Sequence, residues 1–126
     1  MKRLLLPAAL LLLLFGASLM NARYLAAFTA ALNEQLAGAE ALAERGDWDR
    51  AREDTALAAA RWQERGTYLH VTLHHADTDQ ISAAFGEVQE FLECEEAGEY
   101  SAANARLMAL LALLSEAEQL TVQNIL

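Results

Sequence analysis

The first twenty residues hold the longest apolar run in the chain. Leu4 to Met20 carries seventeen residues without a charge, directly after Lys2-Arg3 and shortly before Arg23-Tyr24. A helix of this length is about 26 Å long, slightly under the roughly 30 Å hydrocarbon core of a bilayer, and the residues after Asn21 can extend it. The pattern predicts one membrane-spanning helix over residues 1–23.

From Leu25 onward, apolar positions recur at intervals of three and four, which is the spacing of one buried helical stripe. Nothing between Asn21 and Gly38 breaks a helix, so we expect the first helix to run straight out of the span and to end at Gly46. Asp47 can cap the next helix. In that segment Trp48, Thr55, Trp62 and Leu69 recur every seven residues, so the two tryptophans are predicted core anchors.

The segment from Gly66 to His74 is ambiguous, because Leu69, Val71 and Leu73 alternate with polar residues as they would in a strand. We reject the strand because no second strand pattern exists with which it could pair. The next stripe, which runs to a helix end near Ala97, is out of phase with the tryptophan stripe. A kink or break is therefore expected between Gly66 and Asp79. The new stripe is formed by His74, Thr78, Ile81, Phe85, Val88 and Leu92.

A second corner is predicted at Gly98, since Glu96-x-Gly98-Glu99-Tyr100 resembles Glu44-x-Gly46-Asp47-Trp48 at an offset of 52 residues. The last helix then carries Leu107, Leu111, Leu114 and, in phase with them, Glu118. We therefore predict an all-α fold, with a single transmembrane helix followed by an antiparallel bundle of three to four helices. Residues 1–23 would form the anchor and residues 24–126 the bundle, whose predicted core anchors include Ile81, Phe85 and Leu111.

The anchor is expected to remain uncleaved. Residues 16–22 offer only poor small-residue pairs for a signal peptidase, and the apolar run is longer than the usual core of a signal peptide. Lys2 and Arg3 precede the run, so the positive-inside rule places the N-terminus in the cytoplasm and the bundle outside the cell membrane. Residues 4–20 would then contact membrane lipid.

Charge excludes two classes of partner for the bundle. The residues from Tyr24 onward hold six arginines and all 18 carboxylates. Such a domain is repelled by nucleic-acid phosphate and by anionic lipid headgroups. Cys94 is the only cysteine, so no intramolecular disulfide can form.

The sharpest chemical candidate is His70-x-x-x-His74, with Asp77 close behind. Two imidazoles four residues apart share a helix face and could hold a divalent metal with a carboxylate as third ligand. The alternative, which we prefer, is a structural contact between His74 and Glu118, because both lie on predicted buried stripes and a buried polar group needs a partner. No nucleophile motif or phosphate-binding loop is present, so neither an enzyme nor a bound cofactor is expected.

Several features together resemble the small bacterial proteins grouped as domain-of-unknown-function family 4363. They are the short positive start with a single span, the pair Trp48 and Trp62, the stretch from His74 to Ile81, and the end from Glu118 to Leu126. The resemblance implies an anchored helical bundle that acts with a neighbouring multi-span membrane protein. It supplies no catalytic residues.

Two function classes follow. The first is a structural or interaction subunit that docks on another membrane or envelope protein. The second is an extracytoplasmic sensor that binds a metal or a small ligand. A sensor normally needs a cytoplasmic output, and only Met1 to Arg3 would lie inside, which favours the first class.

Overall fold

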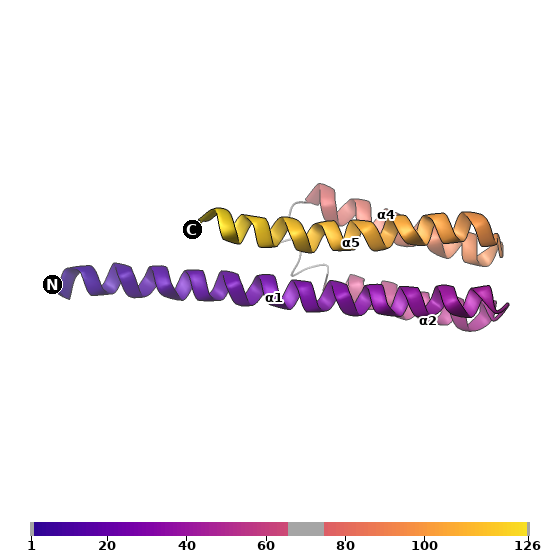
Figure 1. Ribbon diagram of the computed structural model, residues 1–126, viewed down its shortest axis with the longest axis horizontal. Coiled ribbons are helices and arrows are strands. Elements are labelled where there is room, and N and C mark those ends of the chain that lie inside the picture. Colours follow the sequence, from indigo (N-terminus) through magenta and orange to yellow (C-terminus); the bar gives the residue numbers. More distant parts are fainter. Residues whose placement is uncertain (1, 66–74, 126) are drawn as a thin grey trace.

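The protein is an antiparallel bundle of helices. The computed structural model describes residues 2–65 and 75–125, and within them four helices follow one another: α1 (Lys2–Glu44), α2 (Trp48–Glu64), α4 (His75–Glu93) and α5 (Ala97–Ile125) (Figure 1). No strand occurs in these described ranges. The all-α prediction is confirmed.

The helices form a ring in which each contacts two neighbours. α1 packs against α2 and α5, and α4 packs against the same two helices, while the diagonal pairs of described helices make no contact. The core consists of the stripe of small and apolar residues that each helix turns inward, because that stripe recurs every three to four residues. Its fully buried members include Leu32, Leu36, Val88, Leu92 and Leu107.

Two reciprocal polar contacts fix the register of α1 against α5. The Asn33 side chain of α1 donates its Nδ2 hydrogen to the Met108 carbonyl oxygen at 3.2 Å, and Asn104 of α5 donates to the Leu36 carbonyl oxygen at 3.2 Å. Asn104 is completely buried. A slip of either helix would leave these amides without acceptors, which costs roughly 1–3 kcal/mol for each buried group.

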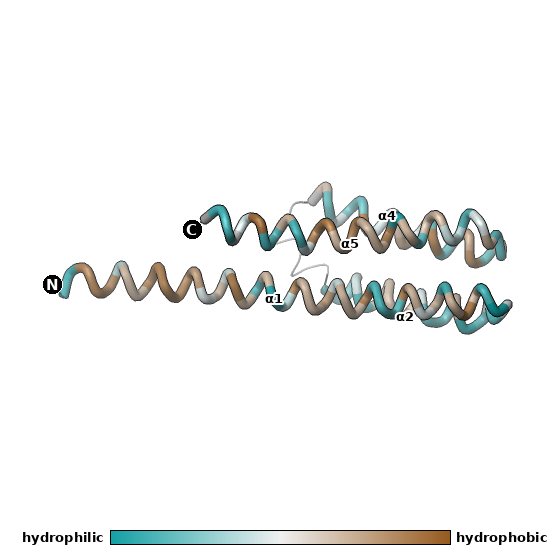
Figure 2. The backbone as a smooth tube through the Cα atoms, viewed as in Figure 1, coloured by the Kyte–Doolittle hydropathy of each residue, from teal (hydrophilic) through white to brown (hydrophobic). Residues whose placement is uncertain are grey.

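α1 is one continuous helix, as the sequence predicted, but only part of it belongs to the bundle. Its first half is an apolar rod, whose N-terminal turns extend beyond the ends of the other described helices (Figure 2). Eight leucines between Leu4 and Leu14 are 56–77% exposed, whereas Leu25, Leu32 and Leu36 are buried. Of the described helices, only α1 is long and apolar enough to cross a membrane, a property that a membrane anchor and a signal sequence share.

Both corners of the bundle are the same kind of turn. At the first, the Asp47 N–H donates to the Leu42 carbonyl and the Gly46 N–H to the Ala43 carbonyl. At the second, 49 residues later, the Glu96 N–H donates to Phe91 and the Glu95 N–H to Leu92. This pattern is a Schellman turn, which needs one residue in the left-handed conformation. Gly46 supplies it with φ 83° and Glu95 with φ 53°.

The prediction of a glycine turn at Gly98 is therefore wrong. Gly98 lies inside the first turn of α5, and α4 ends at Glu93 rather than near Ala97. The corner forms earlier because α5 has already begun at Ala97: the Tyr100 N–H donates to the Glu96 carbonyl at 2.8 Å, which includes Gly98 in the first helical turn. The predicted cap at Asp47 is confirmed: its carboxylate accepts the Arg50 backbone N–H at 3.3 Å.

The chain reverses direction between α2 and α4, which lie antiparallel and in contact (Figure 1). The change of buried face that we expected between Gly66 and Asp79 is therefore a change from one helix, α2, to another, α4. The rejected strand at residues 66–74 falls outside the described part of the chain.

Candidate functional site at the acidic end of the bundle

Negative charge is concentrated at the end of the bundle opposite the apolar rod. The two corners and the helix ends around them, residues 40–54 and 87–99, hold twelve carboxylates and three arginines, a formal charge of −9 that equals the charge of the whole chain. Both of these segments lie at the same end of the molecule (Figure 1). The remaining length of the chain is neutral overall, so the protein has one strongly acidic pole, which we call the acidic end.

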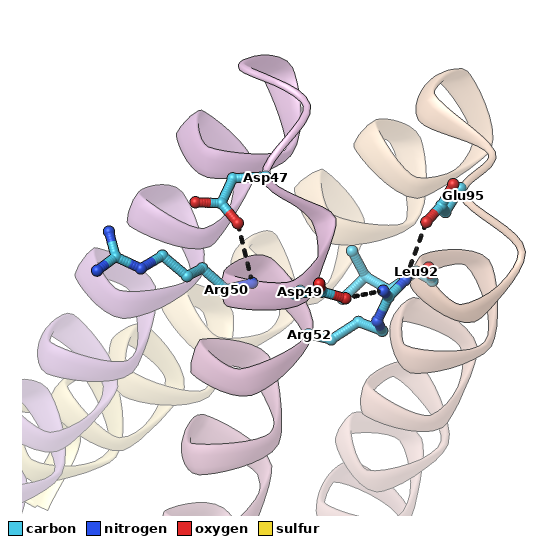
Figure 3. A network of polar contacts seen from close by, with 6 residues as sticks. All are labelled: Asp47, Asp49, Arg50, Arg52, Leu92 and Glu95. Atoms are coloured by element: carbon cyan, nitrogen blue, oxygen red, sulfur yellow. Dashed lines mark hydrogen bonds and ion pairs between the residues drawn. The ribbon is translucent and has the colours of Figure 1, made fainter.

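Arg52 forms polar contacts with both corners of the acidic end (Figure 3). Its Nη1 donates to the Leu92 carbonyl oxygen at 3.1 Å and to Glu95 Oε1 at 3.4 Å, and its Nη2 pairs with Asp49 on the preceding helical turn. The hydrogen bond that Arg52 donates to Asp49 is the main cause that raises the pKa of Arg52 above its usual value. Arg52 thereby links the start of α2 to the last turn of α4 and gives the Leu92 carbonyl, which already accepts the Glu95 N–H, a second donor.

A small cavity lies between the end of α1 and the starts of α2 and α5. It has a volume of about 40 Å³ and is lined by Glu40, Ala43, Glu44, Trp48, Ala97, Tyr100 and Ser101. The Trp48 and Tyr100 rings meet edge to face, with centroids 6.1 Å apart. Ser101 Oγ donates to Glu40 Oε1 at 3.3 Å. The lining thus combines two carboxylates, two aromatic rings and a hydroxyl.

Tyr100 is the unusual member of this cavity. The residue is 1% exposed, and its hydroxyl makes no hydrogen bond within the described part of the chain. Burial, followed by the charges of Glu40 and Glu44, raises the pKa of Tyr100 to about 12. The hydroxyl is therefore neutral at physiological pH and buried, and it is close enough to both carboxylates for their charges to raise its pKa.

Carboxylates also crowd one another at the second corner. A hydrogen bond to Glu99, reinforced by its charge, raises the pKa of the Glu96 carboxyl above 4.5. Such a pair holds a proton more readily than an isolated glutamate, because two close anions repel. A cation placed nearby would relieve this repulsion.

The opposite end of the bundle is aromatic. The rings of Tyr24, Phe28, Trp62 and Phe85 follow one another at centroid distances of 6.4 to 6.5 Å. The Arg65 guanidinium contacts the Tyr24 hydroxyl and lies 5.3 Å from that ring's centroid. Trp62 Nε1 donates to Ser82 Oγ at 2.9 Å, which satisfies the only polar group of that side chain. This end is a packed structural layer.

An open apolar groove of about 240 Å³ lies beside this layer, between the first turns of α4 and the second half of α5. Ile81, Leu110, Leu113 and Leu114 form most of its wall, and Asp77 lies at its edge. Leu113 is 58% exposed.

The sequence-predicted site residues are not brought together by the described structure. His70 and His74 lie outside the described residues, so both the metal hypothesis and the contact between His74 and Glu118 stay predictions. Asp77 is exposed in the first turn of α4, and Glu118 is half-buried on α5. Among the residues that the structure does describe, no group of three His, Cys, Asp or Glu side chains could hold a metal.

The predicted core anchors occupy different depths. Trp62, Ile81, Phe85 and Leu111 are at most 3% exposed, whereas Trp48 is half-buried at the rim of the acidic cavity. Cys94 is exposed in the second corner and is a free thiol.

The cavity residues Glu40, Glu44 and Tyr100 were missed as a site because they come from helices about sixty residues apart, and no linear motif joins them. The sequence offset of 52 residues aligns Trp48 with Tyr100, but the two corners lie 49 residues apart, so these two residues do not hold equivalent places in the structure.

The fold and the two poles define a class of protein, a helical bundle whose first helix has an exposed apolar rod as its N-terminal half. The family model described as "Domain of unknown function (DUF4363)" matches residues 19–125, and the chain belongs to that family. The earlier resemblance is thereby confirmed. Neither a curated protein nor a solved structure matches the chain.

Proposed function

We propose that the protein is a membrane-anchored, non-catalytic interaction subunit that docks through its acidic end on a basic surface of another membrane or envelope protein. The observation that carries the proposal is the separation of the two poles on one continuous helix. The apolar rod is at one end of α1, and the acidic end begins around Glu40.

The exposed rod supports an anchor. None of the most apolar 18-residue window of α1 is buried by the rest of the described chain. Burying eight exposed leucines in lipid would contribute on the order of 10 kcal/mol, which far exceeds thermal energy. The helix would remain in the bilayer once inserted.

The continuity of α1 supports an uncleaved anchor over a signal peptide. Ala22 and Leu25 are 4% and 2% exposed, so the bundle core begins immediately after the rod. A cut near Ala22 would fall inside a helix whose next turn is already packed against its neighbours. Residues 24–44 would then hold the acidic end roughly 30 Å above the membrane surface.

Charge supports the orientation and the kind of partner. Lys2 and Arg3 favour a cytoplasmic N-terminus and place the bundle outside. A pole with a formal charge of −9 speeds encounter with a basic protein surface and discriminates against acidic ones. Nucleic acid is anionic and lipid headgroups are anionic or zwitterionic, so neither offers a basic surface of this kind.

The test is site-specific photo-crosslinking in cells. A photoreactive amino acid replaces Glu53 or Glu93, which are exposed at the acidic end, or Ala60, which is exposed on the side of α2 and serves as the matched control. We expect one defined membrane-fraction adduct from the first two positions only. The adduct should disappear when Asp49 and Glu95 are replaced by their amides. Equal adducts from Ala60, or no adduct from either acidic position, would contradict docking through this end.

The second function class, a ligand-binding module, is favoured by one observation, the cavity between Trp48 and Tyr100.

A further inference from the structure

We infer that the last turns of α5 form a second membrane contact, in which Leu120 enters the headgroup and upper acyl region of the leaflet from which the bundle emerges. The inference rests on the function proposed above, since it needs the rod of α1 to span a bilayer. It adds lipid as the partner of a helix face that the described structure leaves exposed.

The register of α1 against α5 places the end of α5 beside the rod. Three interhelical hydrogen bonds define this register: Asn33 to the Met108 carbonyl, Asn104 to the Leu36 carbonyl, and Ser101 to Glu40. Because the helices are antiparallel, each residue back along α1 is matched by one residue forward along α5. Extended at the helical rise of about 1.5 Å per residue, the register puts Glu118 level with Arg23 and Thr121 level with Met20.

The other two described helices stop short of this level. α2 ends at Glu64, and its C-cap residue Arg65 contacts the Tyr24 hydroxyl of α1. Figure 1 shows α5 continuing beside α1 past the ends of both α2 and α4. Within the described part of the chain, the rod therefore has one helical neighbour at its outer end, and that neighbour is α5.

Both helices lose their charged residues at the same level. α1 carries no charged residue from Leu4 to Ala22, and α5 carries none from Gln119 to Ile125. Contact between the two helices does not explain this, because Met20 and Leu120 are 74% and 57% exposed. A bilayer does explain it, since a charged side chain is costly to place in hydrocarbon whichever helix carries it.

The end of α5 has the composition of a shallow membrane contact. Gln119, Thr121, Gln123 and Asn124 are exposed and uncharged, and their amides and hydroxyl can hydrogen-bond to headgroups and interfacial water. With Met20 at the edge of the hydrocarbon core, the register carries the end of α5 only about 6 Å below that edge. Leu120 then supplies an apolar side chain at the headgroup–acyl boundary.

Lipid fits this face better than a second copy of the chain does. From Tyr24 onward, each copy carries six arginines and 18 carboxylates, so two bundles brought side by side repel each other. Lipid needs no such approach, because a rod that spans the bilayer already holds the end of α5 at the membrane surface.

Leu113 provides a matched control on the same helix. It lies about two helical turns before Leu120, on nearly the same face of α5. The two side chains are 58% and 57% exposed, so they differ in level and not in accessibility within the protein. The register puts Leu113 level with Phe28, about 10 Å farther from the membrane than Leu120.

The test measures the depth of nitroxide spin labels on the full chain in phosphatidylcholine vesicles, from their collision rates with oxygen and with a water-soluble nickel chelate. The labels are attached to Met20→Cys, Leu113→Cys and Leu120→Cys, each combined with Cys94→Ser to remove the native free thiol. We expect the labels at positions 20 and 120 to lie at the same depth within about 3 Å, and the label at position 113 to lie about 10 Å farther out.

The label at position 20 separates the two ways in which the inference can fail. If the chelate reaches it freely, the anchor itself is wrong, and the lipid contact of α5 is wrong with it. If position 20 is in lipid, the inference alone is overturned when the chelate reaches position 120 as readily as position 113. It is also overturned when position 120 is shielded from both reagents, because protein would then cover it.

Discussion

Replacing Glu95 with glycine should stabilise the bundle. Glu95 holds the left-handed position of the second Schellman turn with φ 53°, where a residue with a Cβ is strained by roughly 1–2 kcal/mol and glycine is not. The loss on the other side is small. Its carboxylate lies 3.4 Å from the Arg52 guanidinium, but the side chain is 52% exposed, and such pairs contribute about 0–1 kcal/mol. The net expectation is a gain of about 1 kcal/mol.

The assay is thermal unfolding of the full chain in mild detergent, followed by circular dichroism. A gain of this size corresponds to a rise in Tm of about 4–8 °C for a small domain. Glu95→Gln is the matched control because it removes the charge and keeps the strained backbone. Gly46→Ala is the mirror experiment: an added Cβ meets nothing within 4 Å, so its expected loss of about 1 kcal/mol comes from φ 83° alone.

The reasoning fails if Glu95→Gly lowers Tm, or if Glu95→Gln raises it by the same amount as Glu95→Gly. Either result would mean that the charge at this corner, and not the backbone conformation, controls stability.

Three other predictions follow from the core, the cavity and the rod. Trp62→Ala should lower the free energy of unfolding by about 3–5 kcal/mol, because the ring is 3% exposed between Phe28 and Phe85; a loss under about 1 kcal/mol would refute its role in the core. Folding raises the pKa of Tyr100 to about 12 from an unfolded value of about 10. The free energy of unfolding should therefore be unaffected by this group below pH 10 and should fall by on the order of 2–3 kcal/mol as the pH rises from 10 to 12. Denaturant titrations of Tyr100→Phe should lack this fall. A reporter fused after Leu126 should be active only outside the cytoplasm, with the N-terminus intact by mass spectrometry, and a soluble protein that begins near Ala22 would disprove the anchor.

Local signals predicted the fold well where they agreed with packing. The first corner was readable because Gly46 and Asp47 are typical turn and capping residues and the structure uses both in those roles. The second corner was misplaced because Gly98 seemed to be the obvious turn residue. The structure instead puts Glu95 in the left-handed position, for which glutamate has no local preference, and Leu92 before the turn and Tyr100 after it are both buried.

The candidate site could not be read from the sequence for a related reason. A cavity shared by Glu40, Trp48 and Tyr100 depends on the register of α1 against α5, which is fixed by side chains that bond to carbonyls on the facing helix. A sequence does not show which backbone carbonyl will accept a hydrogen bond from a side chain. Sequence reasoning found the tryptophans as anchors but had no means to pair Trp48 with Tyr100.

The unbroken α1 makes the protein a lever. The rod and the bundle share one helix from Lys2 to Glu44, with no hinge between them, so any tilt of the rod is passed to the acidic end undiminished. Over a lever arm of roughly 30 Å, a tilt of about 20° moves that end sideways by about 10 Å. Hydrophobic mismatch changes the tilt of a span, so with the rod in a bilayer, the reach of the acidic end varies with the thickness of the membrane around it.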